Sequence, residues 1–132
     1  MTAFVDTSAF YALLDRDDDH HAAAHDWARA ARGSSEELVT HNYVVVETAA
    51  VAHRRLGAPA VRAFREGLLR VVSVGYVDER LDGRAWTAYL ASLRRGESLV
   101  DRVSFEYMRD RDIERAFAFD ADFSDEGFET VP

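Results

Sequence analysis

The feature that most constrains the fold is the stretch Met1–Phe10. Ala3–Val5 is apolar, the polar residues Asp6, Thr7 and Ser8 follow at once, and the chain then becomes largely apolar with helical character. This pattern predicts a short buried strand that ends at Asp6 and a helix that begins at Thr7 or Ser8. A strand that runs so directly into a helix is typical of α/β proteins.

The position of Asp6 has two interpretations. In open α/β sheets the functional crevice lies outside the carboxyl ends of the strands, where Asp6 would stand. Alternatively, Asp6 or Ser8 only caps the helix by accepting hydrogen bonds from its free N–H groups. Other carboxylates that converge on the same edge would favour the first interpretation.

The rest of the chain alternates helical and extended patterns without a linker, a repeat or a low-complexity tract. The expected helices are His20–Arg32, Tyr43–Leu56, Ala58–Leu69, Asp78–Arg95 and Leu99–Asp110, and the further strands are Leu38–Thr40, Val71–Val77, Arg115–Phe119 and Phe128–Val131. Asp18 or Asp19 is expected to cap the first of these helices, and Gly96 to end the fourth. With 132 residues, 48% of them hydrophobic, residues 1–132 are predicted to form a single three-layer α/β/α domain with a mainly parallel sheet.

Composition narrows the classes of function. Cysteine is absent, which excludes disulfides and thiolate metal sites and favours a cytoplasmic protein. No apolar run is long enough to span a membrane, and no signal peptide is expected before the first strand. The net charge of −8 opposes strong non-specific binding of nucleic acid.

The charges are unevenly distributed along the chain. Five arginines lie between positions 54 and 70, with Glu66 as the only acid among them, whereas no base follows Arg115 in a segment that carries several acids. The basic residues of that stretch are Arg54, Arg55, Arg62, Arg65 and Arg70. Ordinary solvated helix faces explain this pattern, and so does a basic rim beside an acidic centre.

Glu47 lies in the middle of an apolar helix pattern. Val44, Glu47 and Val51 share one helical stripe, and the neighbouring valines predict a helix that is buried over much of its circumference. A carboxylate there is costly unless it is paired or bound to a cation. A salt bridge with Arg54 or Arg55 is the alternative to a role in a site.

Asp101 opens the first turn of its helix, where the helix dipole favours an acid. Ser98 is available as the cap, so we expect Asp101 to be free to point elsewhere. The stripe continues through Ser104, Phe105 and Met108, which is typical of a core-facing side.

Asp120 follows a phenylalanine-rich strand and Asp122 comes two residues later, so Asp120 repeats the placement of Asp6. Turn residues are the alternative explanation. Together, Asp6, Glu47, Asp101 and Asp120 occupy positions from which an α/β fold builds its site, and four crowded carboxylates need divalent cations. Carboxylate oxygens suit Mg²⁺ or Mn²⁺, and such ions promote phosphodiester hydrolysis. The residues therefore predict a metal-dependent nuclease.

The order of four short motifs resembles the PIN domain family, and most of all the VapC-type ribonuclease toxins of prokaryotic toxin–antitoxin operons. The motifs are Phe4-Val5-Asp6-Thr7-Ser8, Val44-Val45-Val46-Glu47-Thr48, Ser98-Leu99-Val100-Asp101-Arg102-Val103-Ser104-Phe105 and Ala118-Phe119-Asp120-Ala121-Asp122-Phe123. The resemblance covers essentially the whole chain.

The resemblance implies an acidic quartet, Asp6, Glu47, Asp101 and Asp120, that holds one or two Mg²⁺ or Mn²⁺ ions. It implies supporting positions at Thr7 and Ser104, and Asp122 falls at a position where the family varies. It further implies a type II toxin that hydrolyses RNA by metal-activated water, a cognate antitoxin that blocks the cleft, and homodimers.

Other interpretations remain open at this point. A non-catalytic PIN-like protein that binds RNA or a partner would share the fold. A phosphatase with Asp6 as nucleophile usually has a second Asp two residues later and needs a Lys, whereas this chain has Ser8 and no Lys. His21 and His25 have an i,i+4 spacing that can bind zinc, without a third ligand in evidence. Trp86, Tyr89 and Leu93 form an apolar helix face that we expect to pack in the core, with a dimer contact as the alternative.

Overall fold

The computed structural model describes all 132 residues. Its strands are β1 (Thr2–Val5), β2 (Glu37–His41), β3 (Ser73–Gly75), β4 (Arg115–Phe117) and β5 (Glu129–Val131). Its helices are α1 (Thr7–Leu14), α2 (His21–Arg32), α3 (Asn42–Leu56), α4 (Ala58–Glu66), α5 (Glu79–Ser92), α6 (Leu99–Asp110) and α7 (Ala121–Asp125), with the 3-10 helix η1 at Leu68–Val71. None of the helices is long and apolar enough to cross a bilayer.

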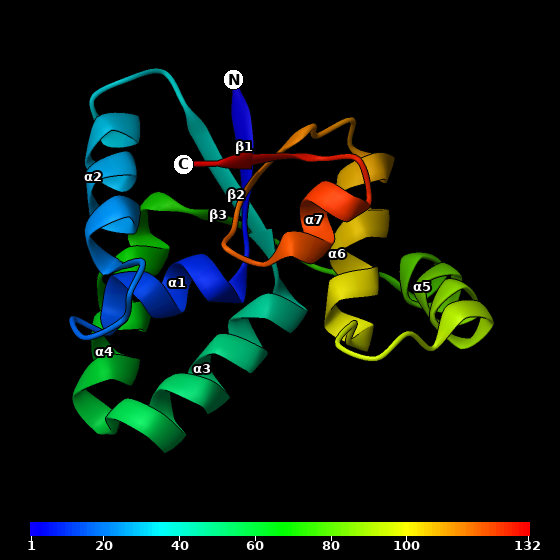
Figure 1. Cartoon of the computed structure of the whole chain (residues 1–132), viewed down its shortest axis with the longest axis horizontal. Helices are drawn as coiled ribbons and strands as arrows, with labels where there is room; N and C mark the ends of the chain where they lie inside the picture. The colour runs from blue at the N-terminus through cyan, green and yellow to red at the C-terminus, as the bar shows by residue number, and fades with distance from the viewer.

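The five strands form one sheet in the order β3-β2-β1-β4-β5, and every neighbouring pair is parallel. β1 is central, with Ala3 opposite Leu38 on one side and Arg115 on the other. Helices α1, α2 and α4 lie on one side of the sheet and α5, α6 and α7 on the other (Figure 1). This arrangement confirms the predicted three-layer α/β/α fold, with a sheet that is wholly parallel.

Aromatic side chains fill the core around β1. The ring centroid of Phe4, which is fully buried, lies 5.8 Å from that of Tyr107 and 6.2 Å from that of Phe123. Phe105 on α6 packs edge-on against Phe123 at 5.0 Å. These contacts fix α6 and α7 against the sheet, and so fix the loops at the carboxyl ends of β1 and β4.

Two predicted strands are shorter than the apolar runs that predicted them. The run from Val71 begins in η1, because Gly67 ends α4 and the chain turns tightly there, so β3 is only Ser73–Gly75. Gly75 is required at this point, since an added Cβ would collide with the Tyr107 hydroxyl. β4 ends at Phe117, two residues before the apolar run does, and the unexpected helix α7 follows Asp120.

Three predicted helix ends are wrong. α4 ends at Glu66 and not at Leu69. α5 ends at Ser92, where Leu93 adopts a left-handed backbone with φ 44°, so Gly96 lies beyond the helix in the following loop. α2 has no side-chain cap; the Asp18 carboxylate accepts instead from the backbone N–H of His20, one residue before the helix.

The expectation that Trp86, Tyr89 and Leu93 pack in the core is also wrong. Trp86 is 43% exposed and Leu93 57% exposed, because α5 turns Leu81 and Ala85 inward instead. The exposed apolar face of α5 remains available for a contact with another molecule.

Candidate active site

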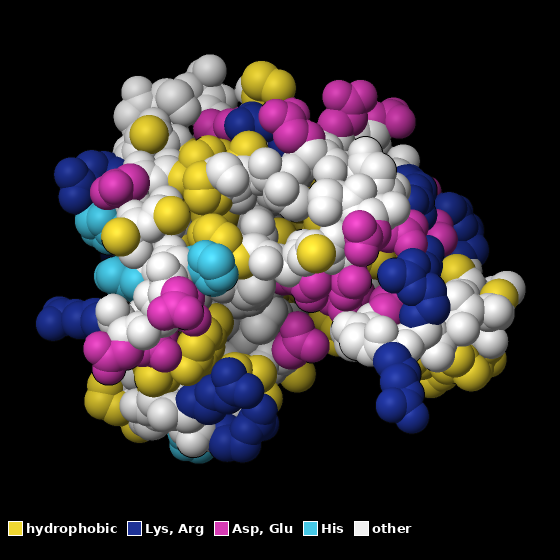
Figure 2. All heavy atoms as spheres, viewed as in Figure 1, with side chains coloured by type: hydrophobic (Ala, Val, Ile, Leu, Met, Phe, Trp, Pro, Cys, Tyr) yellow, Lys and Arg dark blue, Asp and Glu magenta, His cyan; other side chains and the backbone are white.

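The four acids predicted from the sequence line one cleft at the carboxyl ends of the strands, with a volume of about 500 Å³. Asp6 follows β1, Glu47 lies in α3, Asp101 lies in the first turn of α6, and Asp120 directly precedes α7. Acidic side chains gather in a hollow of this face, with arginines on either side (Figure 2). The parallel topology explains the convergence, because it brings the ends of β1, β2 and β4 to the same edge.

Asp6 is both the cap of α1 and part of the cleft. Its Oδ2 accepts from the backbone N–H of Ser8 at 3.1 Å and from the Ser8 hydroxyl at 2.8 Å. Ser8 Oγ in turn accepts from the backbone N–H of Phe119 at 3.0 Å, which ties the start of α1 to the segment before Asp120. Burial raises the pKa of Asp6 to about 6, the Ser8 bonds oppose this shift, and the charge of Glu47 adds to it.

Asp101 belongs to a capping box. Its Oδ2 accepts from the backbone N–H of Ser98 at 3.0 Å, while Ser98 Oγ accepts from the N–H of Asp101. We expected Ser98 to cap the helix and leave Asp101 free for the cleft. This is wrong for Asp101 Oδ2, because in a capping box each of the two side chains accepts from the backbone N–H of the other residue. Burial raises the pKa of Asp101 to about 7, and the charges of Asp6, Asp120 and Glu47 add to the shift.

Two acids of the cleft, Asp101 and Asp120, form a group with Asp122, and each of the three offers a carboxylate oxygen within 4.8 Å of the other two. Asp120 Oδ1 accepts from the backbone N–H of Asp122 at 3.0 Å, so the first turn of α7 holds these two acids together. Burial, followed by the charge of Asp120, raises the pKa of Asp122. Oxygens bound to one octahedral cation lie roughly 3 to 4.2 Å apart, given Mg–O distances of about 2.1 Å, so a divalent cation would draw these three donors slightly closer together.

Glu47 is half-buried, and its helix is more exposed than predicted: Val46, its neighbour, is 69% exposed. The helix buries one stripe, Val44, Thr48 and Ala52, against the core. The predicted alternative, a salt bridge with a nearby arginine, does not occur, since none of the ion pairs includes Glu47. Its carboxylate therefore has no protein cation to neutralise it.

Of the five arginines in the basic stretch, Arg55 alone lines the cleft. Its guanidinium lies 5.6 Å from the ring centroid of Tyr11. Arg62 pairs with Glu66 along α4, as a solvated helix face would. The spacing of Glu47, Val51 and Arg55 on one side of α3 is the signal that distinguishes Arg55 from its neighbours.

The two supporting positions have different surroundings. Thr7 lines the cleft and accepts a hydrogen bond from Thr48 Oγ1 at 3.1 Å, which links α1 to α3. Ser104 is fully buried, donates to the Val100 carbonyl and lies 2.9 Å from His41 Nε2. Its hydroxyl thus faces His41 and does not line the cleft.

His41 was not singled out by its sequence context. Its Nδ1 accepts from the backbone N–H of Val44, so the ring caps α3, and its Nε2–H donates to Ser104 on α6. Burial, together with the charge of Arg111, lowers the pKa of His41 to about 3. The ring is therefore neutral and joins the two helices that carry Glu47 and Asp101. His21, by contrast, has its Nδ1 2.7 Å from the Ala12 carbonyl.

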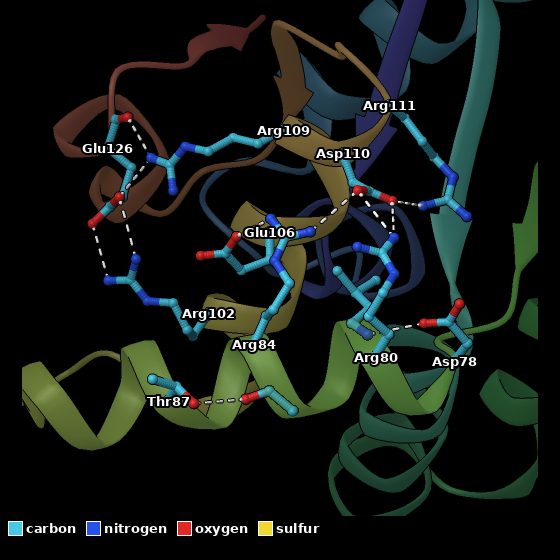
Figure 3. Close-up of polar contacts among 12 residues, drawn as sticks. Asp78, Arg80, Arg84, Thr87, Arg102, Glu106, Arg109, Asp110, Arg111 and Glu126 are labelled. Carbon is cyan, nitrogen blue, oxygen red and sulfur yellow. Dashed lines mark hydrogen bonds and ion pairs between the residues drawn. The ribbon is translucent and has the colours of Figure 1, made fainter.

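An arginine next to Asp101 connects α6 to the end of α7. The Arg102 side chain, only 10% exposed, lies 2.6 Å from Glu97 and 3.1 Å from Glu126. Figure 3 shows Arg102 and Arg109 converging on Glu126 from α6, next to the pairs of Asp110 with Arg80 and Arg84. These contacts tie α6, which carries Asp101, to Glu126 directly after α7, and so support the position of Asp101 relative to Asp120 and Asp122.

Comparisons with known proteins show which family and which structures the chain resembles. Residues 3–129 match the family model of the PIN domain. The chain is 38% identical over 129 residues to the 23S rRNA-specific endonuclease VapC20 of Mycobacterium tuberculosis, in two strains, covering 97% of this chain and 96% of the relative. The crystal structure of Mycobacterium tuberculosis VapC20, described as a toxin that cleaves the sarcin–ricin loop, superimposes with a TM-score of 0.85 at 36% identity and covers 100% of both chains.

Proposed function

The chain belongs to the PIN domain family, and on that premise we propose that it is the toxin of a type II toxin–antitoxin pair and acts as an endoribonuclease. The observation that carries the proposal is the group of Asp101, Asp120 and Asp122, whose carboxylate oxygens all lie within 4.8 Å of one another. The 38% identity to an rRNA endonuclease over nearly the whole chain supports the same activity.

Asp101, Asp120 and Asp122 are the residues we expect to hold Mg²⁺ or Mn²⁺, with Asp6 and Glu47 beside them. A divalent cation there supplies an activated water and neutralises charge on the phosphodiester that is cleaved. The Ser8 hydroxyl donates to Asp6, and Thr7 accepts from Thr48 on α3. These two hydrogen bonds fix Asp6 and the start of α1 relative to α3. Arg55 offers the cleft a positive charge for an RNA phosphate.

We propose 23S rRNA as the first substrate to test, because the curated relative is specific for it. Purified protein, free of antitoxin, is incubated with ribosomes and with total RNA, with and without Mn²⁺ or Mg²⁺, and the cut ends are mapped. Discrete, metal-dependent cuts are expected in 23S rRNA. Cuts in other RNAs would contradict the proposed 23S rRNA substrate but support the proposed endoribonuclease activity.

The alternative function, a non-catalytic binding protein, predicts no cleavage under any metal condition. Cleavage that persists undiminished in chelator would contradict the metal-dependent chemistry. An aspartyl phosphatase is not supported, because Ser8 stands where that mechanism needs its second Asp and the chain has no Lys.

A homodimer and an antitoxin complex belong to the same proposal. The exposed face of α5, with Trp86, Leu90 and Leu93, is an apolar surface of the kind that marks protein contacts. Sedimentation of the antitoxin-free protein at micromolar concentration is expected to give a dimer, and a purely monomeric result would contradict that part. We place the protein in the cytoplasm, where its RNA substrate is.

A further inference from the structure

Two aromatic side chains form a stacked pair inside the candidate active site. The rings of His20 and Phe119 are nearly parallel, with an interplanar angle of 10° and centroids 4.4 Å apart. Both residues line the same cleft as the four acids, and Phe119 directly precedes Asp120. The pair therefore has a defined position next to the carboxylates.

The two rings differ in how firmly they are held. Phe119 is half-buried, its backbone N–H donates to Ser8 Oγ, and its ring packs against that of Phe117, with centroids 6.2 Å apart. His20 is exposed, and its side chain neither caps α2 nor forms another hydrogen bond. Its backbone N–H is held by the Asp18 carboxylate at 2.8 Å. Stacking on Phe119 is thus the contact that orients the imidazole.

An exposed planar ring, fixed on a half-buried one, is suited to stacking with another planar group. The acids beside it repel phosphates, so uncharged contacts to the bases have to contribute to RNA binding on this side of the cleft. Unpaired bases in RNA loops are commonly bound by stacking on aromatic side chains, including histidine.

We propose that His20, supported by Phe119, is a stacking platform for one unpaired nucleobase next to the cleaved phosphodiester. This inference rests on the proposed ribonuclease function and adds a binding residue to it. It assigns to this side of the cleft a preference for RNA that is unpaired at the cut.

The direct test uses a 12-nucleotide unpaired RNA that contains 2-aminopurine, titrated in EDTA so that no cleavage occurs. The fluorescence of 2-aminopurine falls when the base stacks. We expect quenching with the wild type and with His20→Phe, and affinity about tenfold weaker without quenching for His20→Ala. His53→Ala, which removes an exposed histidine on α3 outside the cleft, is the matched control and is expected to behave as the wild type.

The kinetic test uses a hairpin RNA that carries the mapped cut site in its loop. His20→Ala is expected to raise KM about tenfold with a smaller change in kcat, and His20→Phe to restore KM. An abasic nucleotide next to the cut should raise the KM of the wild type by the same factor but leave the KM of His20→Ala unchanged, because both changes remove the same contact.

Several results would overturn the platform. They are equal affinity and quenching for wild type and His20→Ala, a His20→Phe variant as weak as His20→Ala, or additive losses from the abasic site. Urea unfolding of His20→Ala checks that the loss is not one of folding. A wild type that binds and quenches the RNA but never cleaves it would contradict the proposed function while leaving the platform standing.

Discussion

Helix α6 carries an acid at each of its ends, and only one of the two acids is neutralised by arginines. At the first turn, Asp101 faces Asp120 and Asp122 without an arginine partner, and burial raises its pKa to about 7. At the last turn, Asp110 bonds to Arg80 and Arg84, which lower its pKa. The same residue type is left unneutralised in the cleft and neutralised outside it.

This difference identifies the cleft as the part of the molecule that stability alone does not explain. Sixteen arginines are available in the chain, and on the outer face they reach Asp110, Glu106 and Glu126. The cleft acids receive none of these pairs. Crowded, partly buried carboxylates raise the free energy of the folded state unless a cation joins them, so their persistence favours a role in binding one.

The largest expected effect is on cleavage by Asp6→Asn. Asn caps a helix about as well as Asp, so the variant is expected to fold and to bind RNA and antitoxin. Its cleavage rate should fall by at least about 100-fold, because a charge that supports the cation has gone. Rates are compared at equal metal concentration on the mapped RNA. Full activity in the folded variant would leave Asp6 as a helix cap only.

Arg102→Met tests the buried ion pairs that Arg102 forms with Glu97 and Glu126. The change leaves Glu97 and Glu126 without their shared cation, and breaking a buried pair in this way costs about 3 kcal/mol. Urea unfolding should show this loss, and cleavage should fall with it as α7 loosens. Arg84→Met, in which the side chain removed is 44% exposed, is the control and should change stability little. Equal losses in both variants would contradict the positioning role of Arg102.

Asp101→Asn tests the raised pKa of Asp101 through the pH dependence of the free energy of unfolding. Because the folded-state pKa of about 7 lies above the ordinary 3.8, the folded chain binds more protons between these values, and wild-type stability from this group falls as pH rises from about 4 to 7. In EDTA the variant should therefore match the wild type at pH 4 and exceed it at pH 8. Unfolding across this range measures the difference, and Mn²⁺ at pH 8 should stabilise the wild type more. A constant difference with pH would rule out the raised pKa.

Asp110→Asn should give the smallest effect, with the opposite sign. Its lowered pKa means that the ionised form stabilises the fold above about pH 4, and that this contribution disappears as pH falls through the lowered value. The variant is expected to be slightly less stable than wild type at pH 7 and equal to it in strong acid. Added salt should shrink the difference at pH 7, because the pairs are exposed to solvent. A variant more stable than the wild type at pH 7 would contradict the claim that the ion pairs of Asp110 stabilise the fold.

Much of the fold was predictable because its determinants are local. The central strand β1 is an apolar run that ends in a polar residue, at Val5–Asp6, and the helices have their own periodicity. Errors arose where an apolar pattern was compatible with more than one structure. β3 was overestimated because Leu68–Val71 forms η1, and the apolar face of α5 was misassigned because α5 buries Leu81 and Ala85 instead.

The acids themselves were visible in the sequence, since Asp6 and Asp120 follow apolar strands and parallel strands end at one edge of the sheet. The sequence by itself thus determined the layered parallel fold and which carboxylates could reach the cleft. Only the tertiary structure decided that Asp122 joins Asp101 and Asp120, that Arg102 braces them, and that His20 stacks on Phe119. Local periodicity sets which side chains share one face of a helix. Which face is buried, and which residues pair, depends on distances between residues far apart in the chain, and packing alone establishes these.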